Sequence, residues 1–227
     1  MTLVVLIRHA HSSANAAGIL SGQRPDVHLS PQGLAQAKGL IKRLGNIKVH
    51  TIHTSPMVRC QETISPWATK FGSRMFVDEG INEVNYGLWT GKKLRTLSKD
   101  PLWKLVQEKP SKVIFPEGES MKGMQKRAVK TLLESASESG KNPAMLVSHG
   151  DVIKAMIAYA LGMHLDQFQK IVVDPASITI LDVSKTGTKV LLMNNSTATI
   201  SEILNSQPHK RLLVGGGSGS SSGRGKK

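Results

Sequence analysis

Five segments of the chain have the apolar pattern of β-strands: residues 3–7, 50–54, 143–148, 177–183 and 189–193. The first of them is a continuous aliphatic run rich in β-branched side chains, which is typical of a strand buried on both faces of a sheet. The last two flank the turn at residues 185–187 and predict a closing pair of strands.

Apolar positions three and four residues apart predict helices between these strands. The first helix begins at Pro31 with Ser30 as its N-cap, and we expect it to turn five side chains inward: Leu34, Ala37, Leu40, Ile41 and Leu44. A second helix is expected to begin at Ser55–Pro56, to reach Ile64 and to be interrupted at Pro66. Further helices are predicted at residues 94–107, 120–137 and 151–161.

The alternation of strands and helices favours an α/β fold with a largely parallel sheet. Residues 73–118, rich in Gly and Pro, are the least regular part of the pattern. We expect a single catalytic domain over residues 1–205. Residues 206–227, which are rich in Gly and Ser and end in basic residues, predict a flexible tail.

Composition and charge narrow the possible partners only to anions. The hydrophobic content of 39% is enough for a sizeable core, and aromatics are scarce at 4%. The formal net charge is +14, and because residues 215–227 supply three of these charges, the rest of the chain still carries +11. Such a field attracts phosphorylated metabolites, nucleic acids or acidic membrane surfaces without choosing among them.

Cysteine usage and the apolar runs bear on location. A single cysteine, Cys60, excludes an internal disulfide framework and suits a reducing compartment. The opening apolar run is too short for a membrane span and lacks the pattern of a signal peptide. We therefore expect a cytoplasmic protein without a membrane partner.

Three features with the chemistry of phosphate binding follow predicted strands. Arg8-His9 comes directly after the first strand, and His149-Gly150 lies between a strand and a helix. An arginine fork binds phosphate oxygens bidentately, and a neutral imidazole can attack phosphorus. Arg59 lies one turn inside a helix that also follows a strand, where the helix N-terminus itself favours anions. Each feature alone is weak, because a surface arginine or an Arg-His dipeptide is common.

Taken together, the motifs resemble those of the histidine phosphatase superfamily, also called the phosphoglycerate-mutase-like family. The resemblance covers roughly residues 1–193, and it rests on seven motifs in the family's order: LIRHAHS at residues 6–12 with Asn15, DVHLS at 26–30, Gly33 with Gln36 and Ala37, SPMVRCQET at 55–63, NEVNYGLWTG at 82–91, PEGES at 116–120 with Arg127, and SHG at 148–150.

The resemblance implies a three-layer sandwich, with a mixed, mostly parallel sheet between helices and the site at the carboxyl ends of the strands. It implies that His9 becomes phosphorylated, and that Arg8, Arg59 and His149 surround the phosphoryl group. Glu83 would protonate the leaving oxygen and later activate water. Five further residues would bind substrate: Ser12, Asn15, Ser21, Gly22 and Gly150.

Two positions depart from the family pattern. Ala10 stands where the family usually has glycine after the nucleophilic histidine, and its methyl group would shift the backbone if the position required a positive φ. His28 stands where proline is common, which bears on the stiffness of the loop. We expect activity to survive both changes.

No metal or other cofactor is expected. Arginines supply fixed positive charge, and the sequence has neither an Asp/Glu cluster typical of a Mg²⁺ site nor a zinc-binding histidine spacing. Cys60 lacks the arginine six positions on that a cysteine phosphatase needs, so we expect it to be a packed side chain. Since His9 must be neutral and Glu83 must begin protonated, activity is expected to peak at mildly acidic to neutral pH.

The sequence is compatible with three functions. A phosphatase acting on phosphorylated small molecules is favoured, because residues 92–115 are compact and contain one arginine, Arg95, whereas family mutases usually have a longer segment with paired arginines. A phosphoglycerate mutase with the same chemistry is the alternative. A catalytically silent binder of phosphorylated ligands or nucleic acid is the third, although no nucleic-acid-binding motif is present. The sequence leaves the physiological substrate and the oligomeric state open.

Overall fold

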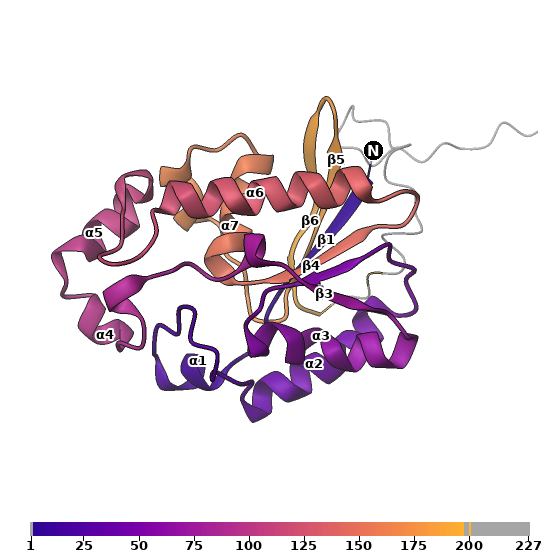
Figure 1. Ribbon diagram of the computed structural model, residues 1–227, viewed down its shortest axis with the longest axis horizontal. Helices are drawn as coiled ribbons and strands as arrows, with labels where there is room; N and C mark the ends of the chain where they lie inside the picture. The colour runs from indigo at the N-terminus through magenta and orange to yellow at the C-terminus, as the bar shows by residue number, and fades with distance from the viewer. Residues whose placement is uncertain (1, 198–199, 201–227) are drawn as a thin grey trace, which may run out of the picture.

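A six-stranded mixed sheet forms the centre of the molecule (Figure 1), whose computed structural model describes residues 2–197 and residue 200. The strand order is β3-β2-β4-β1-β5-β6, with β1 at Thr2–Arg8, β2 at Ile52–Thr54, β3 at Met75–Val77, β4 at Ala144–Ser148, β5 at Ile178–Ser184 and β6 at Gly187–Asn195. Neighbouring strands among the first four are parallel, and β5 is antiparallel to both β1 and β6. The predicted α/β class with a mostly parallel sheet is confirmed, whereas the predicted tail at 206–227 lies outside the described residues.

Helices cover both faces of this sheet, which gives the three layers expected. The α-helices are α1 at Ser13–Ala17, α2 at Pro31–Leu44, α3 at Val58–Phe71, α4 at Leu94–Leu97, α5 at Pro101–Glu108, α6 at Met121–Glu138 and α7 at Gly150–Ala160. Short 3-10 helices lie at Glu79–Ile81, Gly87–Trp89, Pro110–Lys112 and Leu165–Lys170. Figure 1 shows α2 and α3 below the sheet and α6 and α7 above it. Among the described residues, no helix has the length and apolar character needed to cross a membrane.

The side chains of β1 alternate between two hydrophobic cores. Val4 and Leu6 pack in the core that includes buried side chains of α6 and α7, and Val5 and Ile7 pack in the core that includes those of α2 and α3. Successive residues of a strand point to opposite faces of the sheet, so a continuous apolar run is the pattern that a strand covered on both sides requires. The buried run of β1 confirms this expectation.

Helix α2 begins as predicted but buries a narrower face. Ser30 accepts a hydrogen bond from the amide of Gly33, and Pro31 is the first residue of the helix. Leu40 and Leu44 are fully buried, but Leu34 is 51% exposed and Ile41 is only partly buried. The prediction that Leu34 points inward is therefore wrong, because this first-turn residue lies beyond the edge of the core.

Helix α3 begins later and extends further than predicted. Its first residue is Val58 rather than Ser55 or Pro56, and it continues through Pro66 to Phe71 without interruption. Proline removes one backbone donor from a helix, but Ile64 and Trp67 on the same helix are fully buried. Burial of this apolar face stabilises the helix enough to tolerate the missing hydrogen bond.

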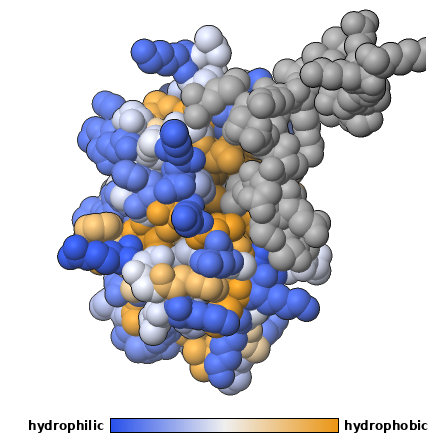
Figure 2. Space-filling view, turned by 90° about the vertical axis from the view of Figure 1, so that its right-hand side faces the viewer, coloured by the Kyte–Doolittle hydropathy of each residue, from blue (hydrophilic) through white to orange (hydrophobic). Residues whose placement is uncertain are grey.

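The irregular segment at 73–118 holds two elements where one helix was predicted. Helices α4 and α5 are separated because Asp100 caps α5, with Pro101 at its first position. The short strand β3 and the five-residue helix α1 were not predicted. Figure 1 shows α1, α4 and α5 together at the left end of the molecule, far from the N-terminus. Figure 2 shows a face at the opposite end, where hydrophilic residues predominate and apolar patches lie between them.

Candidate active site

The pairing of β1 with β4 brings two histidines together. The strands are parallel, with Arg8 opposite Ser148, so that the residues after them, His9 and His149, leave the sheet side by side. The amide of His9 donates to the carbonyl oxygen of Ser148 at 2.8 Å, and the two ring centroids are 5.2 Å apart. Both side chains are buried. Their position at the carboxyl ends of the strands agrees with the expectation from the sequence.

The imidazole of His9 is held in one orientation and in its neutral form. Its Nδ1 lies 2.8 Å from the carbonyl oxygen of Ala10, so Nδ1 carries the proton and Nε2 keeps a free lone pair. Burial lowers the pKa of His9 well below its ordinary value, and the charges of Arg59 and Arg8 lower it further. A neutral imidazole with a free Nε2 has the form required of a nucleophile.

Ala10 fits its position without backbone strain. Its φ is not among the positive values of the described non-glycine residues, and its methyl group is fully buried in a small cluster with Leu29, Ala37 and Ala176. Its amide donates to Oγ1 of Thr63, whose hydroxyl donates in turn to the carbonyl oxygen of Arg59. The alanine therefore leaves the loop after His9 intact.

Arg59 is a fully buried cation within the first turn of α3. Its Nη2 donates to the carbonyl oxygen of Gly22 at 2.8 Å and lies 3.3 Å from Nδ1 of His149. Its Nε has no hydrogen-bond partner in the described structure. A buried guanidinium group with an unused donor favours an anionic ligand.

Arg8 is the second guanidinium group of the site. Its Nη1 donates to the carbonyl oxygen of Val173 at 2.5 Å, and its Nε, like that of Arg59, is buried without a partner in the described part of the chain. A Cβ atom added at Gly150 would lie 3.3 Å from Cζ of Arg8. Glycine at the start of α7 thus lets the guanidinium group lie against a helix N-terminus, which itself favours anions.

Glu83 lies in the loop after the 3-10 helix at Glu79–Ile81. Its Oε1 accepts from the amide of Val84, and its Oε2 lies 3.4 Å from Nδ1 of His149 and 3.8 Å from Nη2 of Arg59. Burial raises the pKa of Glu83 to about 7; the charge of Arg59 opposes this rise, and that of Asp151 adds to it. A carboxyl group with this pKa can both give and take a proton near neutral pH.

His149 completes the group and is oriented by Ser55. Because a guanidinium group can only donate, Nδ1 of His149 accepts from Arg59, which leaves Nε2 to donate to Oγ of Ser55 at 2.7 Å. Burial, and after it the charge of Arg59, lowers the pKa of His149 well below its ordinary value. Sγ of Cys60 lies 3.5 Å from Nε2 of His149, and burial raises the pKa of this thiol to about 12. Cys60 is the packed side chain expected.

The predicted substrate-binding residues occupy less uniform positions. Ser12 and Asn15 bond to each other in a capping box at the start of α1, and Asn15 is exposed. Gly22 contacts the site through its carbonyl oxygen, which accepts from Arg59. Ser21 lines a surface cavity at the side of α1. The structure thus brings Arg8, His9, Arg59, Glu83, His149 and Gly150 together, and it joins Ser12 and Asn15 to each other.

Several residues that orient these groups were not predicted from the sequence. Ser55 and Thr63 lie within the SPMVRCQET motif, but no pattern assigned them to His149 and to the loop after His9. Arg127, known only as part of a motif, donates to the carbonyl oxygens of Asn82 and Glu83. Such contacts join distant parts of the chain, and only the fold shows them.

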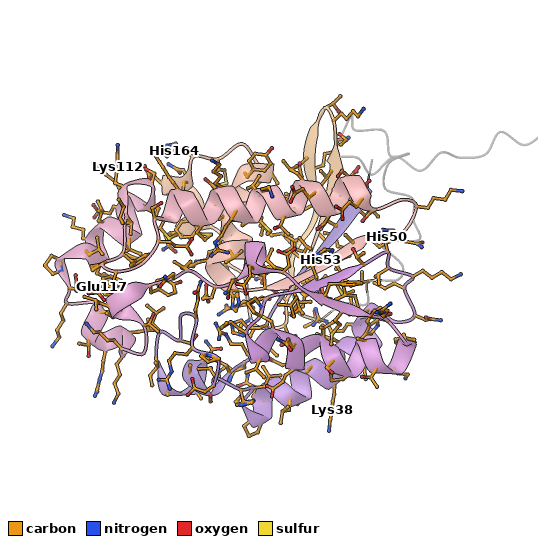
Figure 3. All side chains as sticks on the ribbon, viewed as in Figure 1. Lys38, His50, His53, Lys112, Glu117 and His164 are labelled. Carbon is orange, nitrogen blue, oxygen red and sulfur yellow. The ribbon has the colours of Figure 1, made fainter. Side chains whose placement is uncertain are left out.

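The site also contains side chains of the types that bind metal ions. Possible ligand atoms of His9, Glu83 and His149 lie within 4.8 Å of one another. Arg59 lies among these atoms, however, and Arg8 is beside His9, so a divalent cation would add to one buried and one partly buried positive charge. The electrostatics therefore favour an anion. Figure 3 shows two other histidines, His50 and His164, at the outside of the molecule.

Comparison with known protein families identifies the family that the motifs resemble. Residues 4–196 match the model of the histidine phosphatase superfamily (branch 1). A putative phosphoserine phosphatase 2 from Hydrogenobacter thermophilus is 30% identical over 197 residues, which cover 86% of this chain and 96% of that protein. A 2,3-bisphosphoglycerate-dependent phosphoglycerate mutase from Thermoplasma acidophilum is 28% identical over 91% of this chain and 100% of that protein.

A solved structure supports the same relationship. The phosphoserine phosphatase from Entamoeba histolytica, determined in complex with 3-phosphoglyceric acid, aligns with a TM-score of 0.75 and 27% identity. The alignment covers 87% of this chain and 98% of that structure.

Proposed function

Because the chain belongs to the histidine phosphatase superfamily, we propose that it is a metal-independent phosphatase that hydrolyses phosphomonoesters through a phosphohistidine on His9. The observation that carries this proposal is the hydrogen bond from Nδ1 of His9 to the carbonyl oxygen of Ala10, which leaves Nε2 free beside Arg8, Arg59 and Glu83. A fixed neutral nucleophile next to the buried guanidinium group of Arg59 and the partly buried one of Arg8 is suited to attack on a phosphoryl group.

In the first step Nε2 of His9 forms a bond to phosphorus while the bond from phosphorus to the ester oxygen breaks. Protonated Glu83 gives its proton to this oxygen, so that the product alcohol leaves neutral. In the second step the Glu83 carboxylate takes a proton from water, and the water oxygen attacks phosphorus. The N–P bond breaks, inorganic phosphate leaves, and Glu83 is protonated again.

Arg8, Arg59 and His149 surround the phosphoryl group, and the two arginines act on the charge of its oxygens. Phosphoryl transfer has a loose transition state with negative charge on the equatorial oxygens, so catalysis depends on fixed positive charge and positioning. The unpaired Nε atoms of Arg8 and Arg59 are donors for these oxygens. Ser12, Asn15, Ser21, Gly22 and Gly150 remain the proposed substrate-binding residues.

The substrate class proposed is a phosphorylated small molecule, in keeping with the phosphatases among the relatives. Residues 92–117 and the loop at 21–23 would select among such molecules. The proposed location is the cytoplasm, where the free, buried thiol of Cys60 would stay reduced.

The test is to trap the covalent intermediate and measure turnover in parallel. Wild-type protein is mixed with p-nitrophenyl phosphate in the presence of a chelator, and phosphate release is followed. Rapid denaturation should trap a phosphoryl group that is stable to base and labile to acid, as expected for phosphohistidine.

Two variants make this test specific. His9→Ala should abolish both the trapped phosphoryl group and turnover, whereas His50→Ala, which removes an exposed histidine far from the site, should change neither. Turnover that persists in His9→Ala would rule out the covalent mechanism, and turnover lost on chelation would rule out metal independence.

A mutase is the second candidate, and the full-length match to a phosphoglycerate mutase favours it. It would use the same first step but return the phosphoryl group to a reoriented substrate. Against it stands the compact segment at residues 92–115, in which Arg95 is the only arginine. A coupled assay for interconversion of phosphoglycerates separates the two functions, since a phosphatase would release phosphate instead.

A further inference from the structure

Arg127 of α6 forms a clamp on the segment that carries Glu83. Its Nη1 donates to the carbonyl oxygens of Gly80 at 3.0 Å and Asn82 at 2.7 Å, and its Nη2 donates to the carbonyl oxygen of Glu83 at 3.0 Å. With a longer bond to the carbonyl oxygen of Glu79 at 3.5 Å, one side chain thus holds carbonyl groups of the 3-10 helix at Glu79–Ile81 and of the irregular residues after it. The planar fork of a guanidinium group can make several such bonds at once, whereas an ammonium group on a flexible stem cannot fix the same geometry.

Glu119 extends the clamp to the other side of Glu83. Its two carboxylate oxygens accept from Nη2 of Arg127 at 2.6 Å and from Nε at 3.1 Å, which makes the ion pair bidentate. The same carboxylate accepts from the amide of Asn85 at 2.9 Å. Arg127 and Glu119 therefore hold the main chain both before and after Glu83. The two side chains are only about a quarter exposed, which limits screening of their charges by solvent.

The position of the Glu83 carboxyl group depends on this main chain. The segment after the 3-10 helix at Glu79–Ile81 belongs to no strand or helix that would fix it. Proton transfer requires the donor within hydrogen-bond reach of the ester oxygen, and misplacement by about 1 Å can cost on the order of a hundredfold in rate. A segment without regular structure needs another source of such precision.

We propose that Arg127, oriented by Glu119, is a positioning residue that aligns the Glu83 carboxyl group for proton transfer to the leaving group. This rests on the proposed function, in which Glu83 is the acid. Arg127 does not touch the substrate, and it acts through the carbonyl groups of residues 80, 82 and 83.

The dependence on the leaving group distinguishes this role from general stabilisation of the fold. An acid helps a poor leaving group, such as phenolate, far more than a good one, such as p-nitrophenolate. Loss of alignment should therefore slow phenyl phosphate much more than p-nitrophenyl phosphate. A variant that is simply less stable, or has less positive charge near the phosphoryl group, slows both substrates alike.

The experiment measures kcat/KM for phenyl phosphate and p-nitrophenyl phosphate with four single variants and one double variant. We expect Arg127→Met to lose on the order of tenfold to a hundredfold with phenyl phosphate and less than about threefold with p-nitrophenyl phosphate. Arg127→Lys keeps the charge without the fork and should show the same selectivity to a smaller extent. Lys126→Met, which removes an exposed cation next to Arg127 on the same helix, should leave both substrates unchanged.

Glu83→Gln supplies the reference. Alone it should slow phenyl phosphate more strongly than p-nitrophenyl phosphate, and Arg127→Met added to it should cause little further loss. The inference is overturned if the Arg127 variants lose activity equally on both substrates or lose none. It is also overturned if the losses in the double variant are additive. If Arg127→Met does not fold, the substrate selectivity of Arg127→Lys decides. If Glu83→Gln itself shows no selectivity between the two substrates, the proposed role of Glu83 as the acid is wrong, whatever the Arg127 variants show.

Discussion

The candidate active site, a pocket around His9, Arg59 and His149, is built on a different principle from the segment at residues 87–118. In the pocket, His9, Arg59 and His149 are buried, and each is fixed by a hydrogen bond to main chain or to a neighbouring side chain. The segment consists of short helices and turns whose charged side chains are mostly exposed. It contains seven exposed cations, none of which is in an ion pair among the described residues: Lys92, Lys93, Arg95, Lys99, Lys104, Lys109 and Lys112.

The two regions nevertheless meet. The amide of Leu20 donates to the carbonyl oxygen of Lys92, and the amide of Gly91 donates to that of Leu20. Two residues further along the same loop is Gly22, whose carbonyl oxygen holds Arg59. The pocket thus holds its side chains in one buried, hydrogen-bonded arrangement, whereas the segment that we propose selects the substrate is exposed beside it.

The largest difference should appear when one arginine is removed from each region. Arg59→Ala should lower kcat/KM for p-nitrophenyl phosphate on the order of a hundredfold to a thousandfold, because a fixed positive charge on the transition state is lost. Arg95→Ala, in the exposed segment, should change it by less than about threefold. Thermal unfolding of both variants checks that the fold is retained. A greater loss in Arg95→Ala would reverse the comparison.

A single methyl group should have an intermediate effect inside the pocket. Gly150→Ala places a Cβ atom 3.3 Å from the guanidinium carbon of Arg8, so Arg8 must move, and we expect kcat/KM to fall on the order of tenfold. Gly39→Ala in α2 meets no atom within 4 Å and should leave activity unchanged while stabilising the protein by up to about 1 kcal/mol. Equal activity in the two variants would mean that the position of Arg8 does not matter.

The smallest effect concerns the pH dependence set by residues at the border of the pocket. Glu83 must be protonated in the first step and has a pKa of about 7, so kcat/KM should fall as the pH rises through that value. Asp151→Asn removes a nearby negative charge that raises the pKa of Glu83, and the alkaline limb should therefore move to lower pH. Lys154→Gln removes a cation 3.6 Å from Asp151 and should move the same limb to higher pH. Shifts in the same direction would contradict this electrostatic account.

The chemistry of the site was predictable because it lies where strands end. A buried strand has a clear signature, and Arg8, His9 and His149 follow such strands directly, so their convergence follows from a parallel sheet. Arg59 was predictable because it lies at the start of a helix after a strand. These four residues depend on local patterns and on one rule of sheet geometry.

The contacts that orient the site were not predictable in the same way. These contacts join residues that are far apart in the chain. The separation is 94 positions for Ser55 and His149, 37 for Gly22 and Arg59, and 44 for Glu83 and Arg127. No local pattern specifies such pairs, because they result from how whole elements pack. The exposure of Leu34 has the same origin, since helical periodicity defines a face but not the extent of the core that covers it.

The burial of Cys60 against His149 has a practical consequence. Because its thiol is buried against His149 and has a pKa of about 12, a thiol-specific reagent can neither reach it nor find it ionised in the folded protein. Alkylation must wait until α3 separates from the sheet. Its rate therefore measures how often the region around His149 opens, and Cys60, the single cysteine of the sequence, reports it without any substitution.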